Sequence, residues 1–112
     1  MEIHVDGKPN LAVVKIAAKV MDASNAPSFK DQMEPVIEAN GNVLLDVSSL
    51  EFLDSSGLGA ILSCLRKLTG KGGDMKLCGM TKPVRALFEL VRMHRIIEVY
   101  NTQDEAENAF AA

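Results

Sequence analysis

The chain has 112 residues, a hydrophobic fraction of 47% and a net charge of −3. Its length is that of one domain, so we expect a single folded unit over residues 1–112, and the hydrophobic fraction argues against wholesale disorder. The negative charge argues against direct nucleic-acid binding through phosphate neutralisation. No apolar run approaches the roughly 20 residues that span a bilayer, and no secretory signal is visible, so the sequence predicts a cytoplasmic protein without membrane contact.

The first third of the chain predicts a β-hairpin and then a helix. Strands are expected at residues 3–5 and 11–17, joined by a cluster of turn-forming residues. Apolar residues then recur at helical spacing from Phe29 to Ile37. Pro35 lies within this pattern and lacks an N–H group, so we expect it to kink the helix or to end it early.

The middle third predicts a buried strand followed by a long helix. Residues 43–47 form an apolar run with little alternation, which is typical of a strand covered on both faces. A loop over residues 48–53 follows, and a helix is expected to begin at Ser55 or Ser56 and to end at Gly70. The apolar face of this helix contains Leu58, Ile61, Leu62, Leu65 and Leu68.

The last third predicts two further strand–helix pairs. Residues 75–78 form a short strand, and Thr81 is a candidate N-cap for the helix that follows. A last strand is expected at residues 96–100, and Thr102 begins a capping box that opens a terminal helix. The alternation of strands with helices predicts an α/β fold in which about four helices cover a mixed, mostly parallel sheet of about five strands.

The most informative segment is residues 54–59, Asp-Ser-Ser-Gly-Leu-Gly, at the start of the middle helix. Serine is a common N-cap and glycine allows close packing, so a purely structural role is one interpretation, with Ser55 helping to cap the helix. Under the other interpretation, Gly57 and Gly59 leave a serine hydroxyl open to a modifying partner. Asp22 follows the second predicted strand and is expected at the same edge of the sheet.

The residues give no support for catalysis or for a bound cofactor. The serine segment does not match Gly-x-Ser-x-Gly, because Asp54 occupies the position of the first glycine. A nucleophilic serine needs a positioned base, and His4 and His94 are each isolated in the sequence. The aspartates Asp22 and Asp46 could approach Asp54, but an aspartate within an apolar strand is more often hydrogen-bonded structure. We therefore expect no catalytic residue, no metal and no cofactor.

A longer stretch around the serines carries a family resemblance. Residues 46–59, Asp-Val-Ser-Ser-Leu-Glu-Phe-Leu-Asp-Ser-Ser-Gly-Leu-Gly, resemble the signature of STAS domains, specifically of bacterial anti-sigma-factor antagonists. In that family the serine directly before the first glycine is the phosphorylation site. The resemblance therefore implies Ser56 as the phosphorylated residue, with Ser55 as the runner-up. Ala18 stands where the family has a glycine in the turn that ends at Asp22.

The resemblance implies a binding protein switched by phosphorylation, not an enzyme. The unphosphorylated form would bind a serine-kinase anti-sigma factor and release the sigma factor. The kinase would use ATP to phosphorylate Ser56 and so abolish binding, and a metal-dependent serine phosphatase would reverse the change. The expected partner surface consists of Asp22, Asp54, Ser55, Ser56, Gly57 and Leu58.

Two alternatives stay open at this point. A STAS partner-switching protein can control a pathway other than transcription, such as secretion. A STAS domain can also be an accessory to small-ligand or lipid transport, although such domains often lack the phosphorylatable serine that this chain retains at Ser56.

Overall fold

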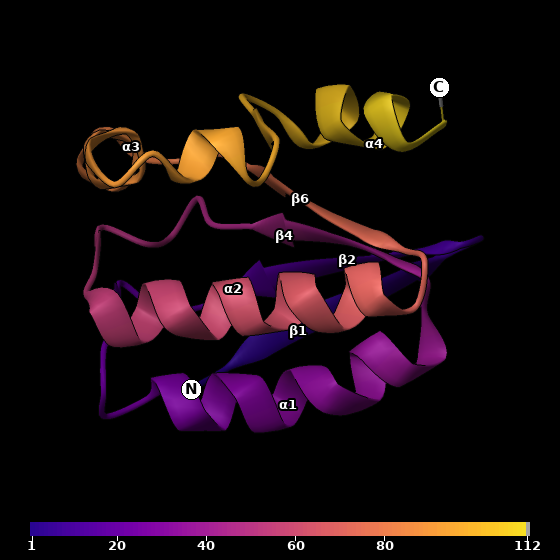
Figure 1. The fold of residues 1–112 in the computed structure, drawn as a ribbon, viewed down its shortest axis with the longest axis horizontal. Helices are drawn as coiled ribbons and strands as arrows, with labels where there is room; N and C mark the ends of the chain where they lie inside the picture. Colours follow the sequence, from indigo (N-terminus) through magenta and orange to yellow (C-terminus); the bar gives the residue numbers. More distant parts are fainter. Residues whose placement is uncertain (112) are drawn as a thin grey trace.

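The computed structural model describes residues 1–111 and contains a five-stranded sheet with helices on both faces (Figure 1). The strand order is β1-β2-β4-β6-β7, in which β1 runs antiparallel to β2 and all other neighbours are parallel. The expected α/β fold is confirmed. The strands of this sheet are β1 (Ile3–Lys8), β2 (Leu11–Ile16), β4 (Asn42–Asp46), β6 (Asp74–Cys78) and β7 (Val99–Tyr100). The helices are α1 (Ala26–Ala39), α2 (Ser55–Gly70), α3 (Lys82–Leu90), the 3₁₀ turn η1 (Met93–Arg95) and α4 (Gln103–Ala111).

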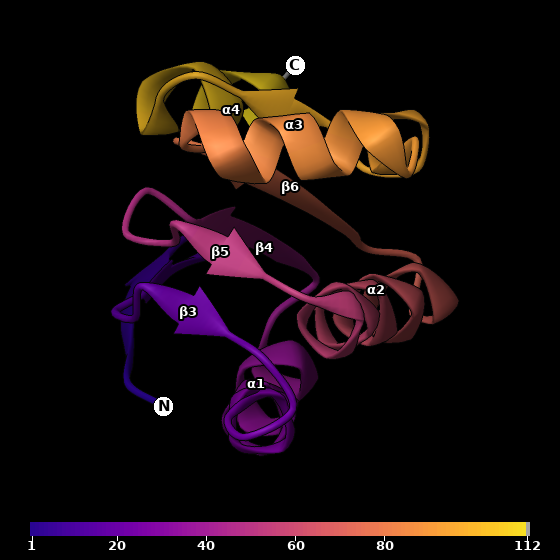
Figure 2. The ribbon, with the colours of Figure 1, turned by 90° about the vertical axis from the view of Figure 1, so that its left-hand side faces the viewer.

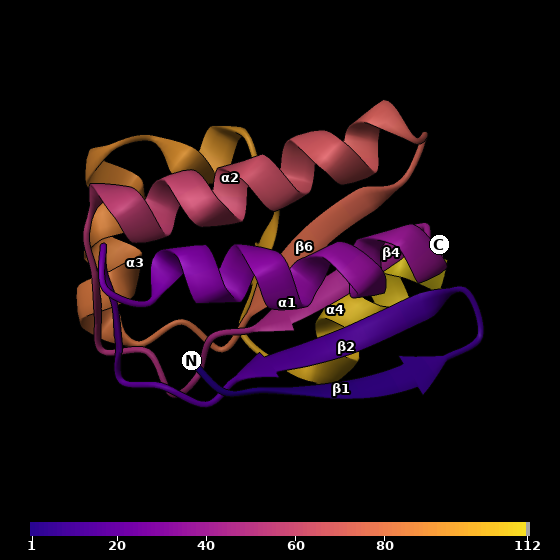
Figure 3. The ribbon, with the colours of Figure 1, turned by 90° about the horizontal axis from the view of Figure 1, so that it is seen from below.

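Helices α1 and α2 lie side by side on one face of the sheet, and α4 covers the other face (Figures 1 and 3). Strand β4 serves both layers, because successive side chains point to opposite faces. Its residues Val43 and Leu45 belong to the main core under α1 and α2, whereas Leu44 packs with Ala106 of α4 in a smaller cluster. All three are fully buried, as the unbroken apolar run predicts.

The opening hairpin is longer than the sequence indicated. Strand β1 continues to Lys8, and the turn is confined to Pro9 and Asn10. Asn10 has a φ of 62°, in the left-handed region that asparagine tolerates better than most residues. The turn between the two strands is therefore narrower than the turn-forming residues between positions 5 and 11 predicted.

Helix α1 passes through Pro35 and ends only at Ala39, so the expectation of an early end is wrong. The buried side chains Phe29, Met33 and Ile37 lie on both sides of the proline along one face. Their burial holds the helix against the core, which offsets the loss of one backbone hydrogen bond at Pro35.

The predicted strand at residues 96–100 is mostly absent. Only Val99–Tyr100 pairs with β6, while Ile96 is 56% exposed and follows the 3₁₀ turn η1. The apolar composition of residues 96–100 suggested a strand because composition alone does not distinguish extended backbone from a buried turn.

Thr81 does stand at the N-cap of α3, but its hydroxyl donates to the carbonyl oxygen of Leu50 at 2.7 Å and makes no capping bond.

Candidate functional site at the N-terminus of helix α2

A two-stranded parallel ladder that the sequence did not indicate positions the site. Strands β3 (Val20–Met21) and β5 (Phe52–Leu53) pair in register, Val20 with Phe52 and Met21 with Leu53. The next residue after each strand is an aspartate, Asp22 after Met21 and Asp54 after Leu53. The backbone N–H of Asp54 donates to the carbonyl oxygen of Met21 at 3.2 Å, so both aspartates emerge at the same end of the molecule.

Asp54 is the N-cap of helix α2. Its Oδ1 accepts hydrogen bonds from the backbone N–H groups of Ser56 at 2.9 Å and Gly57 at 3.1 Å. These are two of the donors that lack a partner within the helix, and the carboxylate also lies at the positive end of the helix dipole. The expectation that Ser55 helps to cap is wrong, because Ser55 is already the first helical residue.

Ser56 is the second residue of α2, and its backbone is held by the Asp54 cap. The Ser56 hydroxyl makes no hydrogen bond with any side chain or backbone group among residues 1–111, although its residue is partly buried. Ser55 is exposed beside it. The helix thus presents two hydroxyl groups on a rigid backbone, and only that of Ser56 belongs to a residue fixed by the cap.

The two glycines of the segment have different roles. Gly57 is buried, and a Cβ atom there would lie 2.8 Å from the carbonyl oxygen of Met21 and 3.1 Å from Cβ of Leu53. Gly57 therefore allows the helix to lie directly against β3 and β5. Gly59 is exposed, and a Cβ atom there would meet nothing within 4 Å. Only Gly59 fits the expectation that glycine leaves open space beside Ser56.

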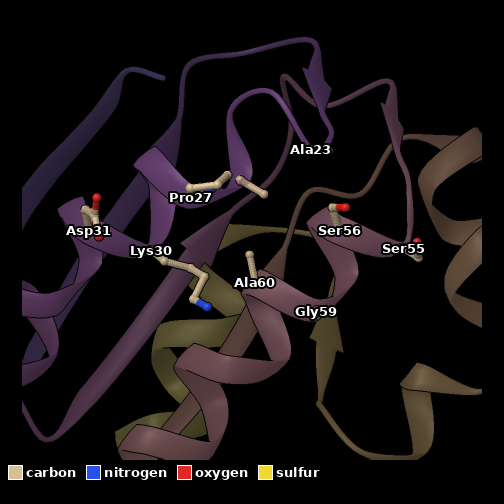
Figure 4. Close-up of a pocket in the computed structure, with 9 residues that line it drawn as sticks. Ala23, Pro27, Lys30, Asp31, Ser55, Ser56, Gly59 and Ala60 are labelled. Atoms are coloured by element: carbon tan, nitrogen blue, oxygen red, sulfur yellow. The ribbon is translucent and has the colours of Figure 1, made fainter.

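The serines border an open groove of about 540 Å³ between the first turns of α1 and α2 (Figure 4). Small side chains leave this groove open on both helices. Lys30 extends from α1 across the groove toward α2 (Figure 4). The lining residues are Ala23, Ala26, Pro27, Lys30, Asp31, Ser55, Ser56, Gly59 and Ala60.

The site combines charges of both signs. Asp22 and Asp54 lie at the strand ends, and Lys30 adds a cation in the groove that sequence spacing alone could not place near Ser56. Hydrogen bonds to Asp22 from the hydroxyl and the backbone N–H of Ser24 hold the pKa of that carboxyl below its usual range. Asp22 is therefore a carboxylate at neutral pH, and it also shapes the turn into α1.

Leu58 of the expected partner surface and Ala18 of the turn before Asp22 both pack against the core. Leu58 is half-buried and packs against the main core, so only part of its side chain faces solvent. Ala18 does not adopt the left-handed backbone that would call for glycine, and it also packs against the core. The neighbouring carbonyl oxygen of Lys19 accepts hydrogen bonds from the backbone N–H groups of Glu51 and Phe52, which ties this turn to β5.

No group of three histidine, cysteine or acidic side chains that could hold a metal ion occurs within residues 1–111. His4 pairs with Glu2 at 3.1 Å on the surface, and His94 borders a separate groove near α3. Neither histidine lines the groove at Ser56. In the same part of the chain, no helix has the length and apolar character needed to cross a membrane.

The fold and the site define a small α/β domain that presents a serine at a capped helix N-terminus. A family model for the STAS domain matches residues 2–106, and the chain belongs to this family. The resemblance inferred from residues 46–59 is thereby confirmed.

The individual proteins to which the chain is similar agree with this assignment. The anti-sigma F factor antagonist of Paenibacillus polymyxa is 26% identical over 108 residues, which cover 95% of this chain and 92% of that protein. The crystal structure of an anti-sigma factor antagonist from Mycobacterium paratuberculosis has a TM-score of 0.89 at 23% identity, covering 99% of this chain and 94% of the other.

A third similar protein has been solved in two states. The anti-sigma factor antagonist SpoIIAA in its unphosphorylated form has a TM-score of 0.81 at 19% identity, covering 98% of this chain and 96% of its own. The Bacillus protein SpoIIAA in its phosphorylated form has a TM-score of 0.73 at 19% identity, covering 97% of this chain and 99% of its own. At this level of identity the likeness concerns the fold.

Proposed function

We propose that this protein is a phosphorylation-switched antagonist of an anti-sigma factor. The unphosphorylated form binds an anti-sigma factor that is itself a serine kinase, and the sigma factor is released. Phosphorylation of Ser56 ends this binding, and a metal-dependent serine phosphatase restores it. The protein is a binding partner and a kinase substrate rather than an enzyme, and it acts in the bacterial cytoplasm, where sigma factors work.

One observation carries the proposal: a serine hydroxyl without an internal hydrogen bond lies on a backbone that the Asp54 cap holds in place. A hydroxyl that serves only stability would be expected to cap the helix, and here the carboxylate of Asp54 already does so. The Ser56 hydroxyl is therefore free to be presented to another protein.

The geometry supports a switch that leaves the fold intact. A phosphate on Ser56 adds a charge of about −1.5 to −2 near the first turn of α2, where the helix dipole favours an anion, although the Asp54 carboxylate already accepts from two of the N–H groups there. Lys30 in the groove wall adds a nearby positive charge. The modified protein is thus expected to stay folded, and the effect falls on the partner.

The cost to a partner is large enough for a switch. An added unit charge opposite a partner carboxylate at about 4 Å costs on the order of 1 kcal/mol in water and about 4 kcal/mol in a partly desolvated interface. A loss of about 3 kcal/mol weakens binding more than a hundredfold. Local charge and bulk therefore suffice, without any change of fold.

The similar proteins support this proposal by their names and states. The relative from Paenibacillus polymyxa is an anti-sigma F factor antagonist. SpoIIAA has been solved both unphosphorylated and phosphorylated. The intact Ser56 favours this class over a transport-accessory STAS domain.

The proposal is tested by incubating the protein with ATP and the candidate anti-sigma kinase of the same bacterium, followed by peptide mapping. Phosphate on Ser56, and none on the Ser56→Ala variant, is the expected result. Phosphate on Ser55 or Thr81 of the wild-type protein would contradict the assignment of the site, and no phosphate at all would contradict the proposed switch.

A further inference from the structure

Two large apolar side chains lie exposed beside the switch serine. Phe52 is 55% exposed and Val20 is 41% exposed, although both belong to the ladder that positions the site. Their strand neighbours Met21 and Leu53 are buried in the core. Because side chains alternate along a strand, Val20 and Phe52 point away from the core, and because they are paired in register they lie next to each other. We call this pair the β3–β5 patch.

The β3–β5 patch and the groove at Ser56 lie at one end of the molecule. Figure 2 looks onto this end, where β3 and β5 face the viewer together with the first turns of α1 and α2. Strand β5 leads directly into α2, so only four peptide units separate Phe52 from Ser56. Four units of 3.8 Å limit the distance between their Cα atoms to about 15 Å.

The short distance between Phe52 and Ser56 means that a kinase bound at Ser56 also covers the β3–β5 patch. A stable protein interface buries about 800 Å² on each partner, which corresponds to a disc of roughly 16 Å radius. A kinase whose active site receives the Ser56 hydroxyl in such an interface therefore reaches the β3–β5 patch as well. A serine on a helix cannot enter a kinase as an extended peptide, so affinity has to come from neighbouring surface such as this.

We infer that the β3–β5 patch is the apolar anchor of the kinase that phosphorylates Ser56. Phe52 is a large aromatic side chain, of a kind enriched in protein interfaces, and it is half-exposed in the free protein. Asp22 follows directly after β3 and adds a carboxylate next to the patch. The complementary surface on the kinase is thus an apolar pocket with a basic side chain at its edge. The inference rests on the proposed function, because it names the kinase of that same switch.

The inference is tested with two patch variants and one matched control. Phe52→Ala removes the aromatic ring, and Val20→Thr makes the second side chain polar with almost no change of volume. Val5→Thr is the control, because Val5 is also an exposed strand valine, at 49%, but lies midway along the edge strand β1. Each protein is titrated calorimetrically into the purified anti-sigma kinase with ADP and Mg²⁺, and its melting temperature is measured.

We expect Phe52→Ala to bind at least tenfold more weakly and Val20→Thr about threefold more weakly, with Val5→Thr unchanged. In phosphorylation assays KM should rise for Phe52→Ala while kcat is retained, because Ser56 is untouched. The melting temperature of Val20→Thr should match that of Val5→Thr, which separates lost contact from lost fold.

The measurements distinguish a failure of the proposed function from a failure of the inference about the β3–β5 patch. A wild-type protein that does not bind the kinase contradicts the proposed function and the inference with it. Wild-type binding that survives in both patch variants overturns the inference alone. A concentration-dependent dimer that Phe52→Ala abolishes, with kinase affinity unchanged, would assign the patch to a second copy of the chain instead.

Discussion

Gly57 and Met21 approach so closely that a methyl group on Gly57 would lie 2.8 Å from the carbonyl oxygen of Met21. The contact joins the first turn of α2 to β3. It sets how deeply the helix that carries Ser56 lies against the ladder.

Gly57→Ala is therefore expected to destabilise the protein by about 1–3 kcal/mol, because the backbone oxygen cannot move aside as a side chain would. Gly59→Ala is the matched control in the same helix, where a Cβ atom meets nothing within 4 Å. It should stabilise the protein by about 0.5–1 kcal/mol, because alanine loses less backbone entropy than glycine. Urea unfolding of both variants measures the difference, and equal effects would contradict the close contact.

The cap predicts a contrast between two neighbouring residues. Asp54→Ala removes the acceptor of two backbone N–H groups and should cost about 0.5–2 kcal/mol. Ser55→Ala removes an exposed side chain that makes no capping bond and should stay within about 0.5 kcal/mol of wild type. Thermal unfolding decides the matter, and a larger loss for Ser55→Ala would show that serine is the cap after all.

How far the sequence predicts this site depends on the kind of contact. Helical spacing correctly places the start of α2 next to Ser56. Asp22 does lie at the same end, but it follows β3 of the separate ladder and not, as expected, the second strand of the main sheet. The ladder of β3 and β5 escapes prediction because two-residue strands have no periodicity to detect. Lys30 escapes because only the packing of α1 against α2 brings it to the groove. Local signals were visible, whereas contacts between distant segments were not.

The preference of serine for helix starts explains one error. Asp, Asn and Ser are nearly equal as N-caps, so three successive candidates could not be ranked from propensity. The register of β5 decides among them, because Leu53 must be buried and Asp54 is then the first residue free to turn into the helix.

The ion pair of Lys76 predicts a pH-dependent contribution to stability. Lys76 is 7% exposed, and its ammonium donates to Glu98 and to Asp74. Burial opposes the charge of Lys76, but these hydrogen bonds outweigh it and raise its pKa. The hydrogen bond from Lys76, followed by that from Tyr100, lowers the pKa of Glu98.

A lowered carboxyl pKa contributes stability that is present above the ordinary value of about 4.3 and is lost as the pH falls through the lowered one. Glu98→Gln should therefore be less stable than wild type at pH 7, with the gap closing toward pH 3. The gap should be small, because the Glu98 side chain is 62% exposed. Urea unfolding across this range tests the trend, with Glu89→Gln of α3 as an exposed control. A gap that widens in acid would contradict the assignment.

Asp22 is expected to contribute to partner binding as well as to its own turn. Asp22→Ala removes a carboxylate beside the β3–β5 patch and should lower the rate of phosphorylation of Ser56. Ser24→Ala is the control, because it removes the hydroxyl that donates a hydrogen bond to Asp22 while the Asp22 carboxylate stays. Equal effects of the two variants on phosphorylation would show that Asp22 acts only through the turn.

The central claim is that a charge on Ser56 weakens association with the kinase anti-sigma factor. The most direct measurement is calorimetric titration of that partner with three proteins: unmodified, Ser56→Ala and phosphorylated on Ser56. We expect Ser56→Ala to bind like the unmodified protein, because the hydroxyl is not the cap. The phosphorylated protein should bind about a hundredfold more weakly and still unfold cooperatively. Equal or tighter binding by the phosphorylated protein would contradict the account.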